Sequence, residues 1–148
     1  MKVKIVNKSN NPLPQYATLS SAGADLYAFL ENPVILKPLE RYLVPTGIYI
    51  ELPEGYEAQV RPRSGLAAKH GVTVLNTPGT IDADYRGEIK VILVNLSNND
   101  FTINSGERIA QMIVSSVSQV DWAKVDELNT TIRGEGGFGH TGLKKLKQ

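Results

Sequence analysis

Hydrophobic and polar side chains alternate along several short stretches of the chain. Tyr56, Ala58 and Val60 are separated by charged or polar residues, so every second side chain is apolar. A period of two residues is typical of a β-strand that buries one of its faces. The same spacing recurs at three other places: Ile48 and Ile50; Ile89, Val91 and Leu93; and Ile109, Gln111 and Ile113. The pattern predicts a domain built from short strands.

Glycine, proline and asparagine separate the predicted strands. They cluster at Asn11-Pro12, Asn32-Pro33, Pro53-Glu54-Gly55, Pro78-Gly79, Asn98-Asn99 and Ser105-Gly106. Short strands interrupted at this spacing predict an all-β fold, a jelly-roll-like barrel or sandwich. We find no internal repeat and no second domain in the sequence.

One stretch departs from the β pattern. Residues 64–71 predict a short helix, with Ser64 as its N-cap and Gly71 just beyond its last turn. Arg61 and Arg63 precede it, so guanidinium groups, a hydroxyl and backbone N–H donors meet at its start. Helix N-termini attract phosphate through these donors and the helix dipole. The segment predicts either a phosphate site or an ordinary capped helix with solvated arginines.

The C-terminal segment is rich in glycine. Residues 133–142 hold five glycines, and a basic tail follows over 143–148. Glycine-rich backbone loses much conformational entropy on ordering, so we expect residues 133–148 to form a flexible arm when no ligand is bound. The predicted organisation is therefore a β domain over residues 1–132 followed by this arm.

Three side chains of the arm suit a ligand. Phe138 lies between glycines without apolar neighbours, and an aromatic ring on a flexible tether suits stacking on a planar base. Arg133 and Thr141 have the chemistry to meet phosphate oxygens. The alternative is a disordered tail with an incidental phenylalanine.

Composition limits the range of partners. The chain has 148 residues, 41% of them apolar and 21% charged, which fits one globular domain. Its formal net charge of +1 gives no global positive field, so we expect no nucleic-acid partner. The absence of cysteine excludes disulfides and thiolate metal sites. No stretch resembles a signal peptide or a membrane span, so we expect a cytoplasmic location without membrane contact.

A connection with two acids follows the predicted helix. Residues 76–87 join the predicted strands 72–75 and 88–95 through a tight Pro-Gly turn, and carry Asp82 and Asp84. A carboxylate on a loop of a rigid β scaffold is a usual place for a general base. Aspartate also favours turns for local reasons, so the acids could equally be turn formers.

Two further polar residues lie on predicted strands. Asp25, at a strand start, could bind a hard cation through water or be purely structural. Gln111 falls between isoleucines and needs a partner or a ligand if it is buried. No Walker-type phosphate loop occurs, and His70 and His140 fit neither a catalytic triad nor a local metal motif.

Five segments, taken in order, resemble the five motifs of the trimeric dUTPase family. They are Ala22-Gly23-Ala24-Asp25-Leu26, Arg61-Pro62-Arg63-Ser64-Gly65-Leu66-Ala67, Asn76 through Gly87, Gly106-Glu107-Arg108-Ile109-Ala110-Gln111, and Arg133-Gly134-Glu135-Gly136-Gly137-Phe138-Gly139. Each motif alone has low specificity, whereas five in register are specific. The resemblance implies a jelly-roll homotrimer whose active sites are shared between subunits. It also implies hydrolysis of dUTP to dUMP and pyrophosphate, which limits uracil incorporation into DNA and supplies dUMP for dTMP synthesis.

The resemblance implies roles for the residues of the third motif. Asp82 would be the general base that activates water for in-line attack on the α-phosphorus. Tyr85 would pack under the deoxyribose and leave no space for a ribose 2′-hydroxyl. A β-hairpin would read uracil, and Lys90 would be a further contact. The hairpin members are Asn76, Gly79, Thr80, Ile81 and Asp82.

The other motifs would hold the phosphates and the metal. The resemblance implies that the triphosphate is bound by Arg63, Ser64, Gly65 and Gln111. Asp25 would orient water around Mg²⁺, the expected cofactor. The arm would close over the substrate through Arg133, Phe138, Gly139 and Thr141. His140 stands where many members have serine, a departure that bears on the γ-phosphate contacts.

Two other functions fit the same scaffold. A dCTP deaminase, or a bifunctional deaminase–dUTPase, shares the fold and would release ammonia from dCTP. A non-catalytic nucleotide-sensing regulatory protein is expected to lack the base or the arm. Both Asp82 and Phe138 are present in this chain.

Overall fold

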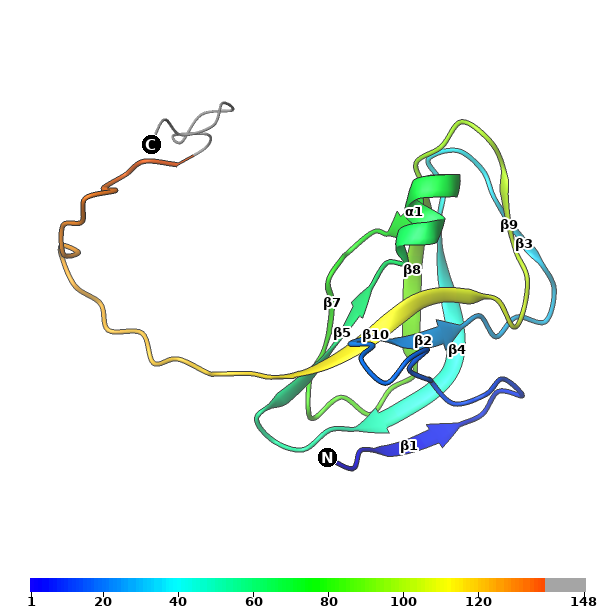
Figure 1. Cartoon of the computed structure of the whole chain (residues 1–148), viewed down its shortest axis with the longest axis horizontal. Helices are drawn as coiled ribbons and strands as arrows, with labels where there is room; N and C mark the ends of the chain where they lie inside the picture. The colour runs from blue at the N-terminus through cyan, green and yellow to red at the C-terminus, as the bar shows by residue number, and fades with distance from the viewer. Residues whose placement is uncertain (138–148) are drawn as a thin grey trace. The chain divides into compact units, whose positions relative to one another are not determined.

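A computed structural model describes residues 1–137 and confirms an all-β fold with one short helix (Figure 1). The elements are β1 (Lys4–Asn7), β2 (Ala24–Tyr27), β3 (Val34–Leu36), β4 (Arg41–Glu51), β5 (Tyr56–Arg61), α1 (Ser64–His70), β6 (Val72–Val74), β7 (Gly79–Ile81), β8 (Ile89–Asn95), β9 (Phe101–Ile103) and β10 (Arg108–Ser116). Within the described residues, no helix has both the length and the apolar character needed to cross a membrane.

The chain divides into two compact units, Met1–Ser118 and Gln119–Gln148. All of the strands and the helix belong to the first unit. Residues 119–137 contain neither helix nor strand. The sequence predicts the arm from Arg133 onwards, whereas the second unit begins at Gln119.

Two antiparallel four-stranded sheets form the body of the first unit. Their strand orders are β1-β4-β8-β6 and β2-β10-β5-β7, and β3 pairs with β9 in a separate two-stranded sheet. Successive strands change sheets, since β4, β6 and β8 belong to the first sheet while β5 and β7 belong to the second. This repeated crossing is the connectivity of a jelly-roll-like sandwich.

The alternating apolar positions fill the space between the two sheets. Val91 and Leu93 of the first sheet are fully buried, as is Ala58 of the second, while Val60 is nearly so. All of them belong to one hydrophobic cluster that draws on both sheets. Burial of these apolar faces is the main stabilising term for the fold, and the alternation predicted for β5 and β8 is confirmed.

The face predicted for β10 is partly wrong. Ala110 and Met112 point into the core, whereas Gln111 and Ile113 are half-buried on the other face. Ile109 is buried nonetheless, because the pairing of β10 with β2 shifts register between Arg108 and Ala110. Such a bulge inserts a residue and reorients the side chains beside it.

The helix also differs by one residue from the prediction. Arg63 is the N-cap, with extended backbone (φ −93°, ψ 128°) and no side-chain capping bond, and Ser64 is already helical. The prediction of Ser64 as N-cap is therefore wrong. The prediction for Gly71 is confirmed, since Gly71 has left-handed backbone (φ 65°) and donates its N–H to the Ala67 and Leu66 carbonyls.

The turn predicted at Pro78-Gly79 lies earlier in the chain: residues 75–78 form a turn and a bend, which include Pro78 but not Gly79. The chain turns earlier, where the Thr77 N–H donates to the Val74 carbonyl oxygen (3.3 Å), and Gly79 begins β7. The reason is that the chain must leave β6 and cross to the opposite sheet, where Gly79 pairs with Val60 of β5. Strands β6 and β8, which lie on either side of this connection, pair with each other in antiparallel orientation.

Two loops share a short repeated sequence, whereas no internal repeat was predicted. Residues 7–11 and 95–99 both read Asn-x-Ser-Asn-Asn. In each loop the first Asn side chain accepts the Ser N–H and hydroxyl and donates to the last Asn carbonyl. Each serine packs against a left-handed glycine, Gly47 or Gly71. The same bonds therefore fix two strand ends of the first sheet.

Replacing Gly71 tests this packing. In Gly71→Ala the new Cβ would lie 3.0 Å from the Ser97 Cβ and would require left-handed backbone. We expect the free energy of unfolding, measured by urea denaturation, to fall by about 2 kcal/mol.

Gly55→Ala is the matched control for the Gly71 variant. Gly55 is also left-handed, with φ of 79°, but a Cβ there meets nothing within 4 Å. The free energy of unfolding of Gly55→Ala should fall by only about 1 kcal/mol. Equal losses in the two variants would contradict a role for the Ser97 contact.

Candidate active site

Six of the residues predicted for the site line one pocket of about 280 Å³. We call this the β7–β8 pocket, and its lining is Leu43, Asn76, Thr80, Ile81, Asp82, Tyr85, Glu88, Lys90 and Ile92. Strand β7 supplies Thr80 and Ile81, and β8 supplies Lys90. Gly79 leaves room for Asn76, because a Cβ on Gly79 would lie 3.2 Å from the Asn76 Nδ2.

Asp82 stands at the end of β7 on an exposed turn. The Tyr85 N–H donates to the Asp82 carbonyl oxygen (3.1 Å) and closes the turn. Among residues 1–137, the Asp82 carboxylate has no hydrogen-bond or ion-pair partner. A carboxylate in this setting is free to hold a water molecule and accept its proton. Asp84 lies on the same turn but does not line the pocket.

Glu88 is a pocket residue that sequence reasoning missed. Its Oε1 accepts the Gly47 N–H (2.8 Å), and its Oε2 lies 3.6 Å from the Lys90 Nζ. Its backbone carbonyl accepts the Tyr85 hydroxyl (3.0 Å). The sequence feature that could have identified Glu88 is the position of an acidic residue directly before a buried strand. Glu88 thus ties the turn that carries Tyr85 to strand β4.

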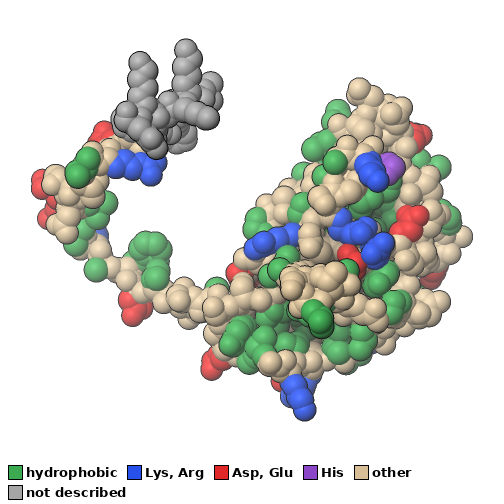
Figure 2. Space-filling model, in the orientation of Figure 1, with side chains coloured by type: hydrophobic (Ala, Val, Ile, Leu, Met, Phe, Trp, Pro, Cys, Tyr) green, Lys and Arg blue, Asp and Glu red, His purple; other side chains and the backbone are tan. Residues whose placement is uncertain are grey.

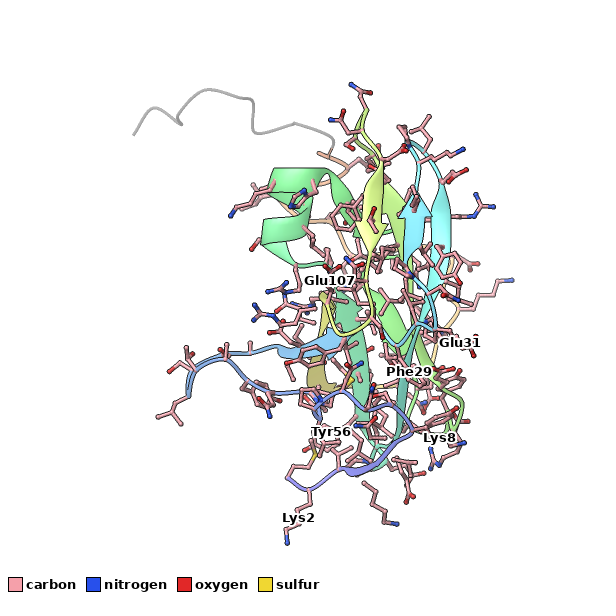
Figure 3. The ribbon with its side chains drawn as sticks, turned by 90° about the vertical axis from the view of Figure 1, so that its right-hand side faces the viewer. Lys2, Lys8, Phe29, Glu31, Tyr56 and Glu107 are labelled. Atoms are coloured by element: carbon pink, nitrogen blue, oxygen red, sulfur yellow. The ribbon has the colours of Figure 1, made fainter. Side chains whose placement is uncertain are left out.

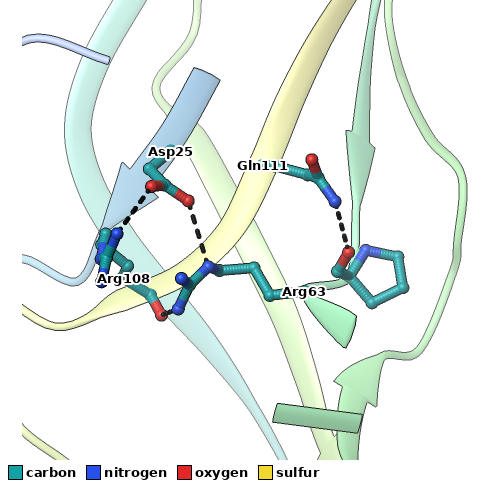
Figure 4. Close-up of polar contacts among 5 residues, drawn as sticks. Asp25, Arg63, Arg108 and Gln111 are labelled. Carbon is teal, nitrogen blue, oxygen red and sulfur yellow. Dashed lines mark hydrogen bonds and ion pairs between the residues drawn. The ribbon is translucent and has the colours of Figure 1, made fainter. Parts of the chain in front are cut away.

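Asp25 lies between two arginines, as Figure 4 shows. Its Oδ1 lies 3.1 Å from the Arg63 Nε and its Oδ2 lies 3.2 Å from the Arg108 Nη1. The Arg63 Nη1 also donates to the Arg108 carbonyl oxygen (3.0 Å). We call these three residues the arginine cluster. Sequence reasoning did not select Arg108 for the site.

The arginine cluster has the charge to attract an anion. Two cations and one carboxylate leave it net positive, and the Arg108 side chain is 50% exposed. Figure 2 shows Lys and Arg side chains gathered, with an acidic side chain among them, on the face that carries β10 and β2. Guanidinium groups bind phosphate oxygens in paired hydrogen bonds, so this surface suits a phosphate chain.

The half-buried side chain of Gln111 has a hydrogen-bond partner, as a polar residue between isoleucines needs. Its Nε2 donates to the Pro62 carbonyl oxygen (2.9 Å), next to Arg63. On the other side, a Cβ on Gly23 would overlap the Gln111 Oε1. Glycine in the first motif therefore makes room for glutamine in the fourth.

The arginine cluster lies away from the β7–β8 pocket. Arg63 and Arg108 line a different hollow, of about 570 Å³, that shares no lining residue with that pocket. Ile81, next to Asp82, pairs with Ala58, and Arg63 lies five residues of extended chain further on, roughly 16 Å away. One copy of the chain thus holds its two candidate groups at opposite ends of β5.

A third hollow, of about 590 Å³, carries none of the predicted site residues. Phe29, Glu31 and Lys8 line it, and Figure 3 shows them apart from Glu107, which belongs to the hollow of the arginine cluster. The Lys8 Nζ lies 4.6 Å from the centre of the Tyr49 ring. Among the described residues, only Glu88 lines both this hollow and the β7–β8 pocket.

The predicted arm residues belong to the second unit. The Arg133 Nε donates to the Gly136 carbonyl oxygen (2.8 Å) within that unit. Phe138, Gly139 and Thr141 lie outside the described residues, as does His140.

A sequence profile of the dUTPase family matches residues 9–142. The chain belongs to the dUTPase family. It is 62% identical over 142 residues to a deoxyuridine 5′-triphosphate nucleotidohydrolase of Finegoldia magna, covering 96% of this chain and 99% of the relative. It is 64% identical over 140 residues to the enzyme of that name from Cytophaga hutchinsonii, covering 95% and 91%.

Solved dUTPase structures share the fold. A dUTPase of Staphylococcus bacteriophage 80alpha, a mutant with dUpNHpp, superimposes with a TM-score of 0.86 at 24% identity, covering 96% of this chain and 99% of that one. A mutant dUTPase of phage phi11 of S. aureus, described for its structural Mg(II) ion, gives 0.79 at 20% identity, covering 88% and 100%. These likenesses confirm the jelly-roll-like architecture of this dUTPase.

The described residues of this dUTPase could bind a metal ion only together with other ligands, such as water and substrate phosphates. Within residues 1–137 there is no cluster of three or more His, Asp or Glu side chains that could form a protein-only site. Mg²⁺ commonly keeps several waters and binds one or two carboxylates together with substrate phosphates. The Asp25 carboxylate retains lone pairs beyond its two arginine bonds, so it can reach a hydrated ion.

Neutralising Asp25 tests the arginine cluster. In Asp25→Asn the two arginines would lose the anion between them and repel each other. We expect the free energy of unfolding to fall by about 1–2 kcal/mol, with a smaller loss at high salt because salt screens the repulsion. Denaturation curves at low and high salt measure both effects.

Glu51→Gln is the control for Asp25→Asn. It removes an ion pair of Glu51 with Lys4 whose side chains are 44% and 80% exposed. Exposed pairs contribute little, so stability should barely change. A loss in Asp25→Asn no larger than in Glu51→Gln would show that the cluster is not held by Asp25.

Proposed function

We propose that this dUTPase hydrolyses dUTP to dUMP and pyrophosphate at a site built around Asp82. The observation that carries the proposal is the β7–β8 pocket, in which a carboxylate without a partner among residues 1–137 shares one small cavity with Tyr85 and Asn76. The names of the relatives, which are deoxyuridine 5′-triphosphate nucleotidohydrolases, support the same substrate.

Asp82 is the general base of the proposed reaction. Its carboxylate accepts a proton from a water molecule, whose oxygen attacks the α-phosphorus in line with the departing pyrophosphate. The bond between the α-phosphorus and the bridging oxygen then breaks. General-base assistance of this kind contributes about 10²–10⁴-fold to a rate.

Uracil is read by backbone groups of β7. Among the described strands, β7 lies at the edge of its sheet, so one side of its backbone has N–H and C=O groups that none of them uses. An N–H and a C=O there pair with uracil O4 and N3–H. Cytosine reverses this pattern and would leave buried polar groups unpaired. Asn76 and Gly79 to Ile81 form this reading edge, with Lys90 beside it.

The phosphates bind to the arginine cluster and the start of α1. Arg63, Ser64 and Gly65 offer a guanidinium, a hydroxyl and a backbone N–H, and Gln111 lies beside them through Pro62. Mg²⁺, when bound, offsets part of the triphosphate charge. Asp25 would hold the ion through water.

A second copy of the chain supplies the arginine cluster to each β7–β8 pocket. The separation of roughly 16 Å along β5 exceeds the length of a triphosphate, which supports a site shared between copies. We propose a homotrimer, as in the family, in a cytoplasmic setting. Such an enzyme limits uracil incorporation into DNA and supplies dUMP for dTMP synthesis.

The β domain spans residues 1–132, and the proposed arm, residues 133–148, follows it in the sequence. We propose that this arm closes over the site. Arg133, Phe138, Gly139 and Thr141 supply a cation, a stacking ring, a close backbone approach and a hydroxyl. Closure of such a segment excludes water and completes the site.

The substrate test is pyrophosphate release from dUTP, dCTP, dTTP and UTP, with and without Mg²⁺. The wild type should act on dUTP with Mg²⁺ and far less on the other three. Asp82→Asn should lower kcat by about 10²–10⁴-fold while dUTP still binds, because only the base is lost. Asp84→Asn, on the same turn but outside the pocket, should stay close to wild type.

Three results would overturn this assignment. They are ammonia release from dCTP, nucleotide binding without hydrolysis in the wild type, and a wild-type kcat in Asp82→Asn. The first identifies a deaminase and the second a nucleotide-sensing protein.

Removing the arm tests its closure. Truncation after Ile132 should lower kcat/KM by about 10²-fold or more, because water would no longer be excluded. The urea denaturation midpoint of the β domain should be retained. Truncation after Gly142, where the family match ends, is the control and should keep full activity. An active enzyme without residues 133–148 would exclude a lid.

A further inference from the structure

Gly87 lies against the ring of Tyr85. A Cβ built on Gly87 would overlap the Tyr85 Oη and Cζ and would lie 2.9 Å from Cε2. Side-chain carbons do not approach an aromatic ring so closely, so the ring can lie there only because residue 87 has no side chain. Gly87 is not among the positive-φ residues of the described chain, so its backbone conformation does not require glycine. Glycine is required at this position by the contact with the Tyr85 ring.

The Tyr85 ring is held from a second side. Its hydroxyl donates to the Glu88 carbonyl oxygen (3.0 Å). The Glu88 side chain is in turn bound to the Gly47 N–H (2.8 Å) on strand β4. The ring therefore cannot shift along the turn without breaking that bond, and it cannot move closer to the backbone than Gly87 permits. Together these contacts fix one wall of the β7–β8 pocket.

We infer that Gly87 is a positioning residue that sets the sugar specificity of this site through Tyr85. The inference rests on the proposed function, in which the Tyr85 ring packs under the deoxyribose. Rejection of a ribose depends on the ring standing where a 2′-hydroxyl would collide. Gly87 itself does not line the β7–β8 pocket. It determines where the ring stands.

Gly87→Ala should therefore change selectivity as well as rate. The methyl group displaces a rigid ring, which has only two side-chain torsions and cannot bend around it. We expect kcat/KM for dUTP to fall about tenfold, because small misplacements in a site have large effects on rate. The ratio of kcat/KM for dUTP to that for UTP should also fall severalfold, since the ring no longer stands at the collision position.

A double-mutant cycle with Tyr85→Ala tests the inference. In the Tyr85→Ala background the ring is absent, so adding Gly87→Ala should leave the dUTP/UTP ratio unchanged. An equal fall in the ratio in both backgrounds would overturn the inference, because residue 87 would then act without the ring. An unchanged ratio in the single variant would overturn it as well.

A structural readout separates this inference from the proposed function. In a crystal structure of Gly87→Ala, the Tyr85 Oη should lie beyond hydrogen-bond distance from the Glu88 carbonyl oxygen, and an unmoved ring would overturn the inference. If the single variant fails to fold and the double variant folds, the ring contact is supported. If both fail to fold, the inference is overturned. A wild type that does not hydrolyse dUTP would overturn the proposed function and the inference together.

Discussion

The pairing of β5 with its two neighbours determines where the chemistry of this chain lies. On one side β10 pairs with β5 and then with β2, so Gln111 stands between Arg61 and Asp25. On the other side β7 pairs with Ala58 to Val60 of β5 and leads directly into Asp82. Both pairings depend on core residues such as Ala58 and Val60, which face the opposite sheet. A change of register by one residue would turn these side chains outward and separate the polar groups.

Several glycines act in this fold by leaving space rather than by forming turns. Gly23 leaves space for Gln111, and Gly87 leaves space for the Tyr85 ring. Neither has the left-handed backbone that glycine usually supplies. Gly71 combines both properties, since it is left-handed and packs against Ser97. Two side chains of the proposed site, Gln111 and Tyr85, thus take up space that a side chain on the neighbouring glycine would fill.

The sequence predicted the buried faces of β5 and β8, because alternation reveals which face of a strand is buried. It predicted Asp82, Tyr85 and Lys90 together, since they are close in sequence. It did not reveal Glu88 as a pocket residue or Arg108 as a partner of Asp25, because these contacts depend on strand register and on a bulge in β10. The repeated Asn-x-Ser-Asn-Asn loops were visible in the sequence, but only the hydrogen bonds reveal that they are equivalent.

We propose that Asp82 of one copy and Arg63 of another complete each site. Mixing two inactive variants, Asp82→Asn and Arg63→Ala, tests it most directly by dUTP hydrolysis after joint refolding. If the two residues come from different copies, random trimers should recover about one quarter of the wild-type rate, because one pairing in four restores both residues. If a single copy must supply both residues, the mixture should remain as inactive as either variant alone, and the account would be contradicted.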